Sequence, residues 1–498
     1  MNNLLFDALA AGGAPEASAI EWEGSKLSYV DLWRETARWA QALSELGIAP
    51  GERVAVQVEK SLANLLVYLG AVRAGAVFLP LNPAYTAAEL AFFVADAEPA
   101  LVVCDPSRRA EVAAIAGRAR VLTLDGAGQG TLADLAARQE GQFDSVARAP
   151  GDLAAICYTS GTTGRSKGAM LSHRSLASNA ATLKDLWRFT ERDVLIHALP
   201  IYHVHGLFVA THVSLMAGAT MILQPRFDPD AVLAALPRST ALMGVPTFYT
   251  RLLAKPGLSR ASAGHIRLFV SGSAPLPPAV HQQWQARTGQ AILERYGMTE
   301  TGMNASNPYD GPRLAGAVGP PLPGIELRVA DEESGQPAET GGVGLVQVRG
   351  PNLFSGYWCN PAKTAEAFTA DGWFRTGDLG RLDDEGFLWL VGRSSDLVIS
   401  GGLNVYPAEV EAVIEEAPGV VESAVIGAPH ADLGEAVVAI VVADGKVCEE
   451  DILATLTGRL ARFKQPRRVI FVEALPRNAM GKVVKAELRR TYADLFSA

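Results

Sequence analysis

One stretch of the sequence gathers residue types that bind phosphate oxygens. From Thr159 to Gly168 the chain reads TSGTTGRSKG, which combines hydroxyls, glycines and a lysine. Glycines expose backbone N–H groups, hydroxyls donate hydrogen bonds and Lys167 adds a positive charge, so the stretch suits a polyphosphate. It is not a Walker A loop, because the Gly-x4-Gly-Lys-Ser/Thr pattern fails; the alternative is a flexible hairpin of turn residues. The candidate residues are Thr159, Ser160, Gly161, Thr162, Thr163, Gly164 and Lys167.

Strand-like and helix-like segments alternate along the first 300 residues and would position this loop. The stretches 53–59 and 101–105 read as apolar strands, whereas 61–75 and 86–97 have the helical period. This alternation predicts an α/β fold with substantial parallel sheet. The apolar stretch LAAICY leads into the phosphate loop and AMLS leads out of it.

The texture of the sequence changes twice in its second half. Short strands with Gly and Pro turns between about 316 and 393 indicate a β-rich subdomain. After Arg393 a small α+β unit follows, in which EDILATLTGRLARF is predicted to form one helix. We therefore expect an N-terminal domain over 1–393 and a mobile C-terminal domain over 394–498.

Composition excludes several classes of protein. The 498 residues suggest about three domains, and 49% apolar with 19% charged residues exclude a disordered chain. A net charge of −9 argues against a protein that coats nucleic acid. The N-terminus has no secretory pattern, and no apolar run reaches the length of about 20 residues that a membrane span needs. The four cysteines lack zinc spacing, so we expect reduced thiols in a cytoplasmic protein.

Two other classes of site find no support. The glycines of 126–130 follow a strand-like stretch but lack the third glycine of a dinucleotide-binding turn, so this segment reads as a loop. No Gly-x-Ser-x-Gly elbow is present, which argues against an ordinary serine hydrolase.

A resemblance to a known family rests on motifs that occur in one order along nearly the whole chain. These motifs are YTSGTTGRSKG, LPIYHVHG, SGSAPL, ERYGMTET, WFRTGDLG, GRSSDLVISGGLNVYPAEVE and PRNAMGK. The series resembles that of the adenylate-forming superfamily of acyl-CoA synthetases, luciferases and adenylation domains. The wording of HVHGL, GVPTFYTRLL and ERYGMTETGMNASNPYDGPR is most similar to malonyl-CoA synthetases. The resemblance implies that a carboxylate attacks the α-phosphorus of ATP and that coenzyme A then displaces AMP.

The resemblance also implies how ATP is held. The phosphate loop would bind the β- and γ-phosphates, Thr299 would touch the α-phosphate and Glu300 would ligate Mg²⁺. Tyr296 offers a ring to adenine, although a core tyrosine is the alternative. Asp378 would accept hydrogen bonds from ribose hydroxyls, unless it is a type I turn aspartate that follows a strand. Arg393 could bridge ribose and phosphate.

The acyl and adenylate contacts implied by the resemblance fall in three motifs. His203 would line the carboxylate and thioester region, whereas His205 is as readily a satisfied structural histidine. No third ligand stands at metal spacing from these two histidines, so a metal site there is not expected. The further candidates are Ser271, Gly272, Ser273 and Met303.

The C-terminal domain would supply groups for both half-reactions. Lys482 would meet the carboxylate and α-phosphate oxygens, and the alternative is one more surface lysine. Its acylation by a protein acetyltransferase would switch the enzyme off by removing the charge. Ser400, Gly401 and Gly402 would face coenzyme A. The hinge has Ser395 where the family usually has Asp or Lys, so the pivot itself is in question.

The choice of acid depends on Arg251. The stretch 242–253 reads as a strand that breaks at Pro246 into an apolar helix, and Arg251 on that helix could grip the second carboxylate of malonate. The alternative is a solvent-facing helix arginine. The functions left open are a ligase for methylmalonate or another short acid, an adenylation module that loads a carrier-protein thiol, and luciferase-type oxidation. No nucleic-acid or membrane partner is expected.

Overall fold

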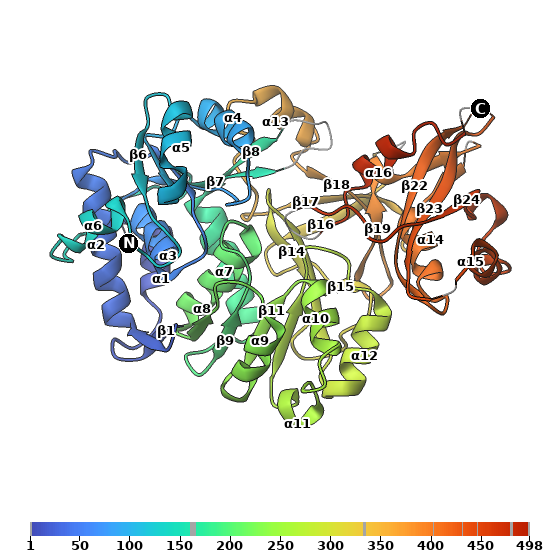
Figure 1. Cartoon of the computed structure of the whole chain (residues 1–498), viewed down its shortest axis with the longest axis horizontal. Helices are drawn as coiled ribbons and strands as arrows, with labels where there is room; N and C mark the ends of the chain where they lie inside the picture. The colour runs from blue at the N-terminus through green and yellow to red at the C-terminus, as the bar shows by residue number, and fades with distance from the viewer. Residues whose placement is uncertain are drawn as a thin grey trace. The chain divides into compact units, whose positions relative to one another are not determined.

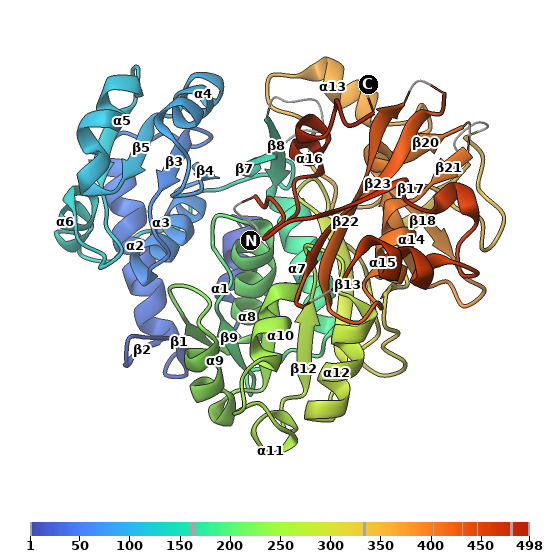
Figure 2. The same ribbon diagram turned by 45° about the vertical axis from the view of Figure 1, so that its right-hand side comes forward.

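The computed structural model describes residues 2–159, 166–331, 335–401, 403–430, 432–445, 447–478 and 482–496. The chain divides into two units, Met1–Glu326 with Val348–Phe374 and Leu327–Gln347 with Arg375–Ala498. Figures 1 and 2 colour the chain from blue at the N-terminus to red at the C-terminus. Among the described residues, none of the helices is long and apolar enough to cross a bilayer.

The first unit contains a six-stranded sheet in the order β6-β5-β3-β4-β7-β8. Every neighbouring pair is parallel except β7 and β8, which are antiparallel and flank the phosphate-loop motif. All of β5 (Leu101–Cys104) is buried, as expected for a parallel strand covered on both faces. The other strands are β3 (Arg53–Gln57), β4 (Val77–Pro80), β6 (Arg120–Thr123), β7 (Leu153–Thr159) and β8 (Lys167–Ser172).

The first unit also contains an eight-stranded sheet in the order β14-β13-β12-β11-β9-β10-β1-β2. The strands from β13 to β1 run parallel, and β14 and β2 are antiparallel edges. The bounds are β1 (Ser18–Trp22), β2 (Ser25–Ser28), β9 (Val194–His197), β10 (Thr220–Leu223), β11 (Ala241–Gly244), β12 (Leu268–Ser271), β13 (Ile292–Met298) and β14 (Gly302–Ser306). β15 (Ala317–Gly319) lies against β13 and β14.

Helices cover these sheets. α3 (Leu62–Arg73) is apolar on nearly all sides and buried along almost its whole length, and it packs against α2 (Tyr29–Glu45), as the blue region of Figure 1 shows. The other helices of the unit are α1 (Leu4–Ala10), α4 (Ala87–Ala97), α5 (Arg109–Ile115), α6 (Thr131–Ala137), α7 (His173–Leu186), α8 (Thr211–Ala217), α9 (Pro229–Ala235), α10 (Pro246–Leu253), α11 (Arg260–Ala263), α12 (Pro278–Thr288) and α13 (Pro361–Ala367).

The second unit contains two smaller sheets. One has the order β19-β18-β17-β16, and in the other β21-β20-β23-β22 lie in order while β24 pairs with β23. α14 packs against β22 of the long β22–β23 hairpin and against α15, which Figure 2 shows in orange and red. The bounds are β16 (Glu326–Ala330), β17 (Gly344–Arg349), β18 (Phe374–Leu382), β19 (Leu388–Arg393), β20 (Val398–Ser400), β21 (Leu403–Val405), β22 (Val420–His430), β23 (Gly434–Ala443), β24 (Arg468–Phe471), α14 (Pro407–Ile414), α15 (Glu449–Leu456) and α16 (Lys485–Thr491).

The predicted fold class, a large α/β part with a β-rich region and a small α+β part, is confirmed. One predicted helix is too long. α15 ends at Leu456, and only Arg462–Lys464 is helical again, as a single 3₁₀ turn. Thr457 is extended and Gly458 has a φ of 78°, so the backbone leaves the helix there although the apolar period continues.

Candidate active site

The candidate residues of the first unit lie where parallel strands end. β9, β11, β12 and β13 run parallel, so their carboxyl ends meet at one edge of the sheet. The segments that follow these ends contain the predicted histidine loop, the start of α10, the Ser271–Ser273 turn and the Thr299–Glu300 turn. Sheet topology therefore gathers four motifs that are far apart in the sequence.

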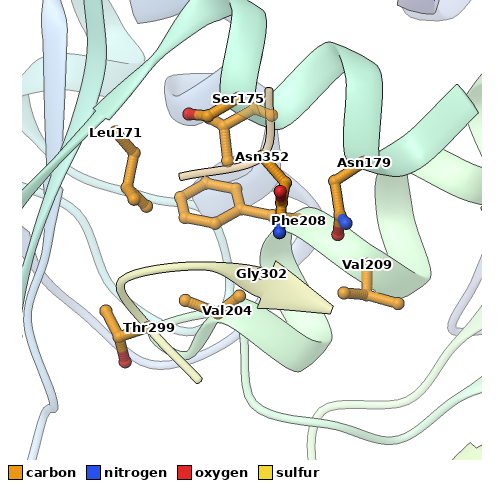
Figure 3. A pocket seen from close by; sticks show the side chains of 10 residues that line it. Leu171, Ser175, Asn179, Val204, Phe208, Val209, Thr299, Gly302 and Asn352 are labelled. Carbon is orange, nitrogen blue, oxygen red and sulfur yellow. The ribbon is translucent and has the colours of Figure 1, made fainter. Parts of the chain in front are cut away.

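Two asparagines hold the turn that carries Thr299 and Glu300. The side chain of Asn179 on α7 donates to Met303 O at 2.9 Å and accepts from Met303 N at 3.0 Å. Asn352 donates to Thr301 O at 2.7 Å. Figure 3 shows both asparagine side chains beside Gly302, in the wall of a cavity of about 10 Å³. That volume is about that of one water molecule, so this cavity is too small for a substrate.

Glu300 is buried and faces the phosphate-loop strands. Its side chain is 6% exposed, and Tyr357 donates a hydrogen bond to Glu300 Oε1 at 3.0 Å. The nearby carboxylate adds to burial in raising the pKa of Cys157 on β7 to about 12. Thr159 and Lys167 are paired across β7 and β8. The predicted residues Ser160, Gly161, Thr162, Thr163 and Gly164 lie outside the described residues.

An arginine that the sequence reasoning did not single out lies buried beside the predicted residue Gly272. Arg295 on β13 is 3% exposed, and its Nε and Nη2 have no hydrogen-bond partner among the described residues. Burial lowers the pKa of Arg295 to about 9, so the guanidinium is still charged at neutral pH. The buried His205 Nε2 and Ser271 Oγ also have no partner among the described residues. Buried polar groups of this kind usually have a partner, so these atoms are candidates to bind a substrate group or water.

Gly272 makes room for this guanidinium. Ser271 and Glu294 are register partners on the parallel strands β12 and β13, so Gly272 and Arg295 follow them side by side. A Cβ atom on Gly272 would lie 2.4 Å from Arg295 Cζ, so a side chain there would displace the guanidinium. Ser273 adopts a φ of 72°, which is uncommon for serine, and its Oγ lies 3.3 Å from His205 Nδ1.

The predicted arginine of α10 is placed differently. Arg251 is exposed, and no hydrogen bond or ion pair joins it to the described part of the chain. Phe248 and Tyr249 are buried, and Tyr249 donates to Val270 O at 2.6 Å. Two residues correspond to about 200° around a helix, so Arg251 lies on the opposite face of α10 from Tyr249. The strand that breaks at Pro246 into an apolar helix is confirmed.

A buried lysine, Lys60, binds the backbone that leads into the loop with His203 and His205. Lys60 donates to the carbonyls of His197 at 2.7 Å and Leu199 at 2.8 Å, and its Nζ lies 3.1 Å from His197 Nδ1. His197 Nε2 lies 3.0 Å from the carbonyl of Gly206, at the other end of the loop. Burial lowers the pKa of His205, and neighbouring Arg295 lowers it further, so the ring is neutral at pH 7.

Asp378 and Arg393 form an ion pair in the second unit. Asp378 lies inside β18 and not in a turn after a strand, so the type I turn alternative is wrong. It is the register partner of Arg393 on β19, and Arg393 Nε lies 3.0 Å from Asp378 Oδ1. Gly392 has a φ of 147° and still pairs with Leu379, and the register shifts between Leu379 and Gly380.

Lys482 lies shortly before α16. Its N–H donates to Asn478 Oδ1 at 3.0 Å, and Asn478 N–H donates to Lys482 O at 2.9 Å. Lys482 is exposed. Ser400 ends β20 and Gly401 has a φ of 60°, whereas Gly402 lies outside the described residues. A groove of about 200 Å³ adjoins this hairpin and is lined by Ser400, Gly401, Leu403, Leu433, Val437, Phe463, Gln465 and Arg467.

The remaining predicted residues have simple placements. Tyr296 is buried on β13 and Met303 is buried on β14. His203 accepts a hydrogen bond from the His205 N–H at 3.3 Å. Within the described ranges, no group of three or more His, Cys, Asp or Glu side chains could hold a metal by itself. A metal bound at Glu300 would therefore need ligands from a substrate.

Four residues of this region were missed by the sequence reasoning. Arg295 could have been found, because a charged residue in a strand of a sheet buried on both faces is exceptional. Lys60, Asn179 and Tyr357 carry no comparable signal, since their partners lie 137, 124 and 57 residues away in the sequence.

Comparison with known proteins places the chain in a family. The AMP-binding enzyme family matches residues 8–358, and the AMP-binding enzyme C-terminal domain matches residues 409–482. ATP-bound MatB from Rhodopseudomonas palustris is 56% identical with a TM-score of 0.98, and the match covers 100% of both chains. Indoleacetate–CoA ligase of Aromatoleum aromaticum is 37% identical over 97% of this chain and 96% of that protein. Malonate–CoA ligase of Arabidopsis thaliana is 36% identical over 94% of this chain and 82% of that protein.

The indoleacetate and malonate ligases are named for very different acids, although both are almost equally identical to this chain. Identity to these two relatives therefore does not select the acid. The order of the motifs, the fold and the matches agree over nearly the full length. The chain belongs to the AMP-binding enzyme family.

Proposed function

We propose that the protein is an AMP-forming acid–thiol ligase that joins malonate to coenzyme A. In the first step a malonate oxygen attacks the α-phosphorus of ATP, which gives malonyl-adenylate and releases pyrophosphate. In the second step the coenzyme A thiolate attacks the acyl carbon and AMP leaves. The substrates are thus malonate, ATP and coenzyme A, with Mg²⁺ as the accompanying cation.

The observation that carries the choice of malonate is the buried Arg295 beside Gly272. A buried guanidinium without an anion costs several kcal/mol, so its retention points to a substrate that brings one. A carboxylate fits a guanidinium with two parallel hydrogen bonds, and the unpartnered His205 Nε2 and Ser271 Oγ lie in the same region. Malonate has a second carboxylate that does not react. An aryl or alkyl acid would leave the charge unpaired. Arg251, which was predicted to grip the second carboxylate of malonate, remains a candidate contact.

The nucleotide contacts are proposed from the motifs that the chain shares with the family. Thr159, Lys167 and the loop between them would bind the β- and γ-phosphates, and Thr299 would bind the α-phosphate. Asp378 and Arg393 would bind the ribose. Glu300 fits Mg²⁺, because Mg²⁺ takes one or two protein carboxylates and completes its shell with phosphates and water. Bound there, Mg²⁺ would neutralise charge on the phosphates.

Tyr296, Ser273, Met303 and His203 would complete the adenine, adenylate and acyl contacts. Ser273 and Gly272 can bring backbone close to the adenylate because neither position has a bulky side chain.

The C-terminal domain, predicted as 394–498, would serve both steps. Lys482 would bring its charge to the carboxylate and α-phosphate oxygens during adenylation. The Ser400–Gly402 segment would face coenzyme A in the second step. A protein acetyltransferase that acylates Lys482 is a proposed regulator, because the change would remove the charge that adenylation needs. A cytoplasmic location is proposed from the spacing of the cysteines.

Pyrophosphate release over a panel of acids tests this function. The purified full chain is given ATP and Mg²⁺ with malonate, methylmalonate, succinate, acetate, butyrate or indoleacetate, with and without coenzyme A. We expect malonate to give the highest kcat/KM and malonyl-CoA to form only with coenzyme A. Release that favours a monocarboxylate would contradict the assignment to malonate. Release that coenzyme A does not convert into thioester would instead support loading of a carrier-protein thiol.

A further inference from the structure

Tyr357 contacts two residues that the proposed function assigns to ATP and Mg²⁺. The side chain is 7% exposed. Its hydroxyl donates to Glu300 Oε1 at 3.0 Å, and Lys167 Nζ lies 4.7 Å from the centroid of its ring. The hydroxyl of Tyr357 therefore contacts the candidate metal ligand Glu300, and the face of its ring contacts the candidate phosphate-binding group of Lys167.

The backbone fixes this position. Residues 354–358 run antiparallel to β8, with Ser355 N–H donating to Met170 O at 2.8 Å and Trp358 N–H donating to Gly168 O at 2.8 Å. Phe354 N–H donates to Glu300 O at 2.8 Å. The segment is thus bonded both to the strand that begins with Lys167 and to the backbone of Glu300.

The two contacts act in different ways. A hydrogen bond to one carboxylate oxygen fixes the rotation of the carboxylate and so sets its orientation toward a cation. An ammonium over an aromatic face is attracted by the ring and stays charged. We propose that Tyr357 is a positioning residue that aligns Glu300 through its hydroxyl and Lys167 through its ring. The inference rests on the proposed roles of those two residues and adds the group that sets them relative to each other.

The hydroxyl and the ring can be removed separately. Tyr357→Phe keeps the ring and removes only the contact with Glu300. Tyr357→Leu removes both contacts. The hydroxyl should therefore matter only when Mg²⁺ accompanies ATP, whereas the ring should also matter for ATP alone.

Calorimetric titration of ATP into the full chain, without any acid, tests this inference. Each protein is titrated once in Mg²⁺ and once in EDTA. We expect Tyr357→Phe to weaken ATP binding about 10-fold in Mg²⁺ and to leave it unchanged in EDTA. Tyr357→Leu should also weaken binding in EDTA, by about 2- to 5-fold. Electron paramagnetic resonance of Mn²⁺ with ATP gives a second readout, and the Tyr357→Phe protein should hold Mn²⁺ more weakly than the wild type.

Tyr29→Phe is the matched control. Like Tyr357, Tyr29 is buried and its hydroxyl donates a hydrogen bond, here to the carbonyl of Ala219 at 2.7 Å. Tyr29 has no part in the proposed site. Its titrations should match the wild type in both buffers. Equal binding by Tyr357→Phe and wild type in Mg²⁺ would overturn the inference, as would an equal loss in Mg²⁺ and EDTA. If wild-type ATP binding itself does not depend on Mg²⁺, the proposed role of Glu300 fails, whatever Tyr357 does.

Discussion

Asp378 and Arg393 stand opposite each other on β18 and β19, and their side chains form an ion pair of 3.0 Å. They are separated by a strand, a turn and a strand, so the hairpin brings together two residues that were predicted separately as ribose contacts. A pair that is ordered before the nucleotide arrives lowers the cost of ordering it on binding. The second strand of this hairpin leads directly into the expected hinge.

Whether the hinge turns at Ser395 is testable, and two contacts flank this residue. Ser394 Oγ donates to Gly377 O at 3.1 Å, and Asp396 pairs with Arg489 of α16 at 2.7 Å. Ser395 lies between these contacts, in the 3₁₀ turn Ser394–Asp396. Ser395→Pro fixes φ, so we expect it to slow one half-reaction at least about 10-fold more than the other. Single-turnover pyrophosphate release and thioester formation from preformed malonyl-adenylate measure the two steps. Ser395→Ala is the control, and equal slowing of both steps by Ser395→Pro would speak against the pivot.

Lys482→Ala should separate the half-reactions in the other way. Loss of one preorganised charge costs about 100- to 1,000-fold, so adenylation should fall by that factor. Thioester formation from preformed malonyl-adenylate should remain near the wild-type rate. Lys485, which pairs with Glu411, offers a control as Lys485→Ala. An equal loss in both steps for Lys482→Ala would remove the proposed role.

Arg251→Leu tests the second predicted contact with malonate. We expect kcat/KM for malonate to fall while ATP binding and turnover of butyrate stay level or rise. Because Arg251 is exposed, solvent should screen its charge, and the loss should be smaller than for the buried arginine. Steady-state kinetics with both acids give the answer. Unchanged malonate turnover would mean that Arg251 is an ordinary surface arginine.

Glu415 on the segment after α14 should make the C-terminal sheet sensitive to pH. Burial, with neighbouring Glu411 and Glu422, raises the pKa of Glu415 to about 7 from 4.5. The folded state therefore binds the proton more tightly, so stability is greatest below about pH 4.5 and falls as pH rises to about 7. Glu415→Gln keeps the acceptor for Ser423 N–H and removes the charge.

We expect Glu415→Gln to protect the amides of β22 from hydrogen exchange more than the wild type at pH 8. The gain should be of the order of 1–3 kcal/mol and should shrink as pH falls towards 5. Hydrogen exchange of both proteins at matched pH measures it, and Glu416→Gln on the exposed side is the control. A gain that is the same at pH 5 and pH 8 would exclude titration of Glu415 as its cause.

Sequence reasoning could predict what depends on local patterns. The strands β3 and β5, the helices α3 and α4 and the break at Pro246 all follow from apolar periodicity and turn residues. The end of α15 at Leu456 could not be read from the period, because it depends on the backbone at Thr457 and Gly458.

The site was predictable only in part, for a similar reason. The motifs named Thr299, Glu300, Ser271 and Gly272, and the carboxyl ends of parallel strands bring them to one edge. The motifs did not show that Arg295 turns inward over Gly272, or that Tyr357 reaches Glu300. Those contacts depend on packing between segments that are distant in the sequence. Local sequence patterns do not predict such packing.

The preference of Arg295→Leu between malonate and malonamate tests the central claim most directly. Malonamate has the size of malonate but a neutral amide in place of the second carboxylate. We expect the wild type to prefer malonate by about 2–5 kcal/mol in kcat/KM, and Arg295→Leu to lose most of that preference. The variant should melt no lower than the wild type, because it removes an unpaired buried charge. Gly272→Ala, which displaces the guanidinium, should lose the preference as well. A variant at position 295 that still prefers malonate by the wild-type ratio would contradict the account.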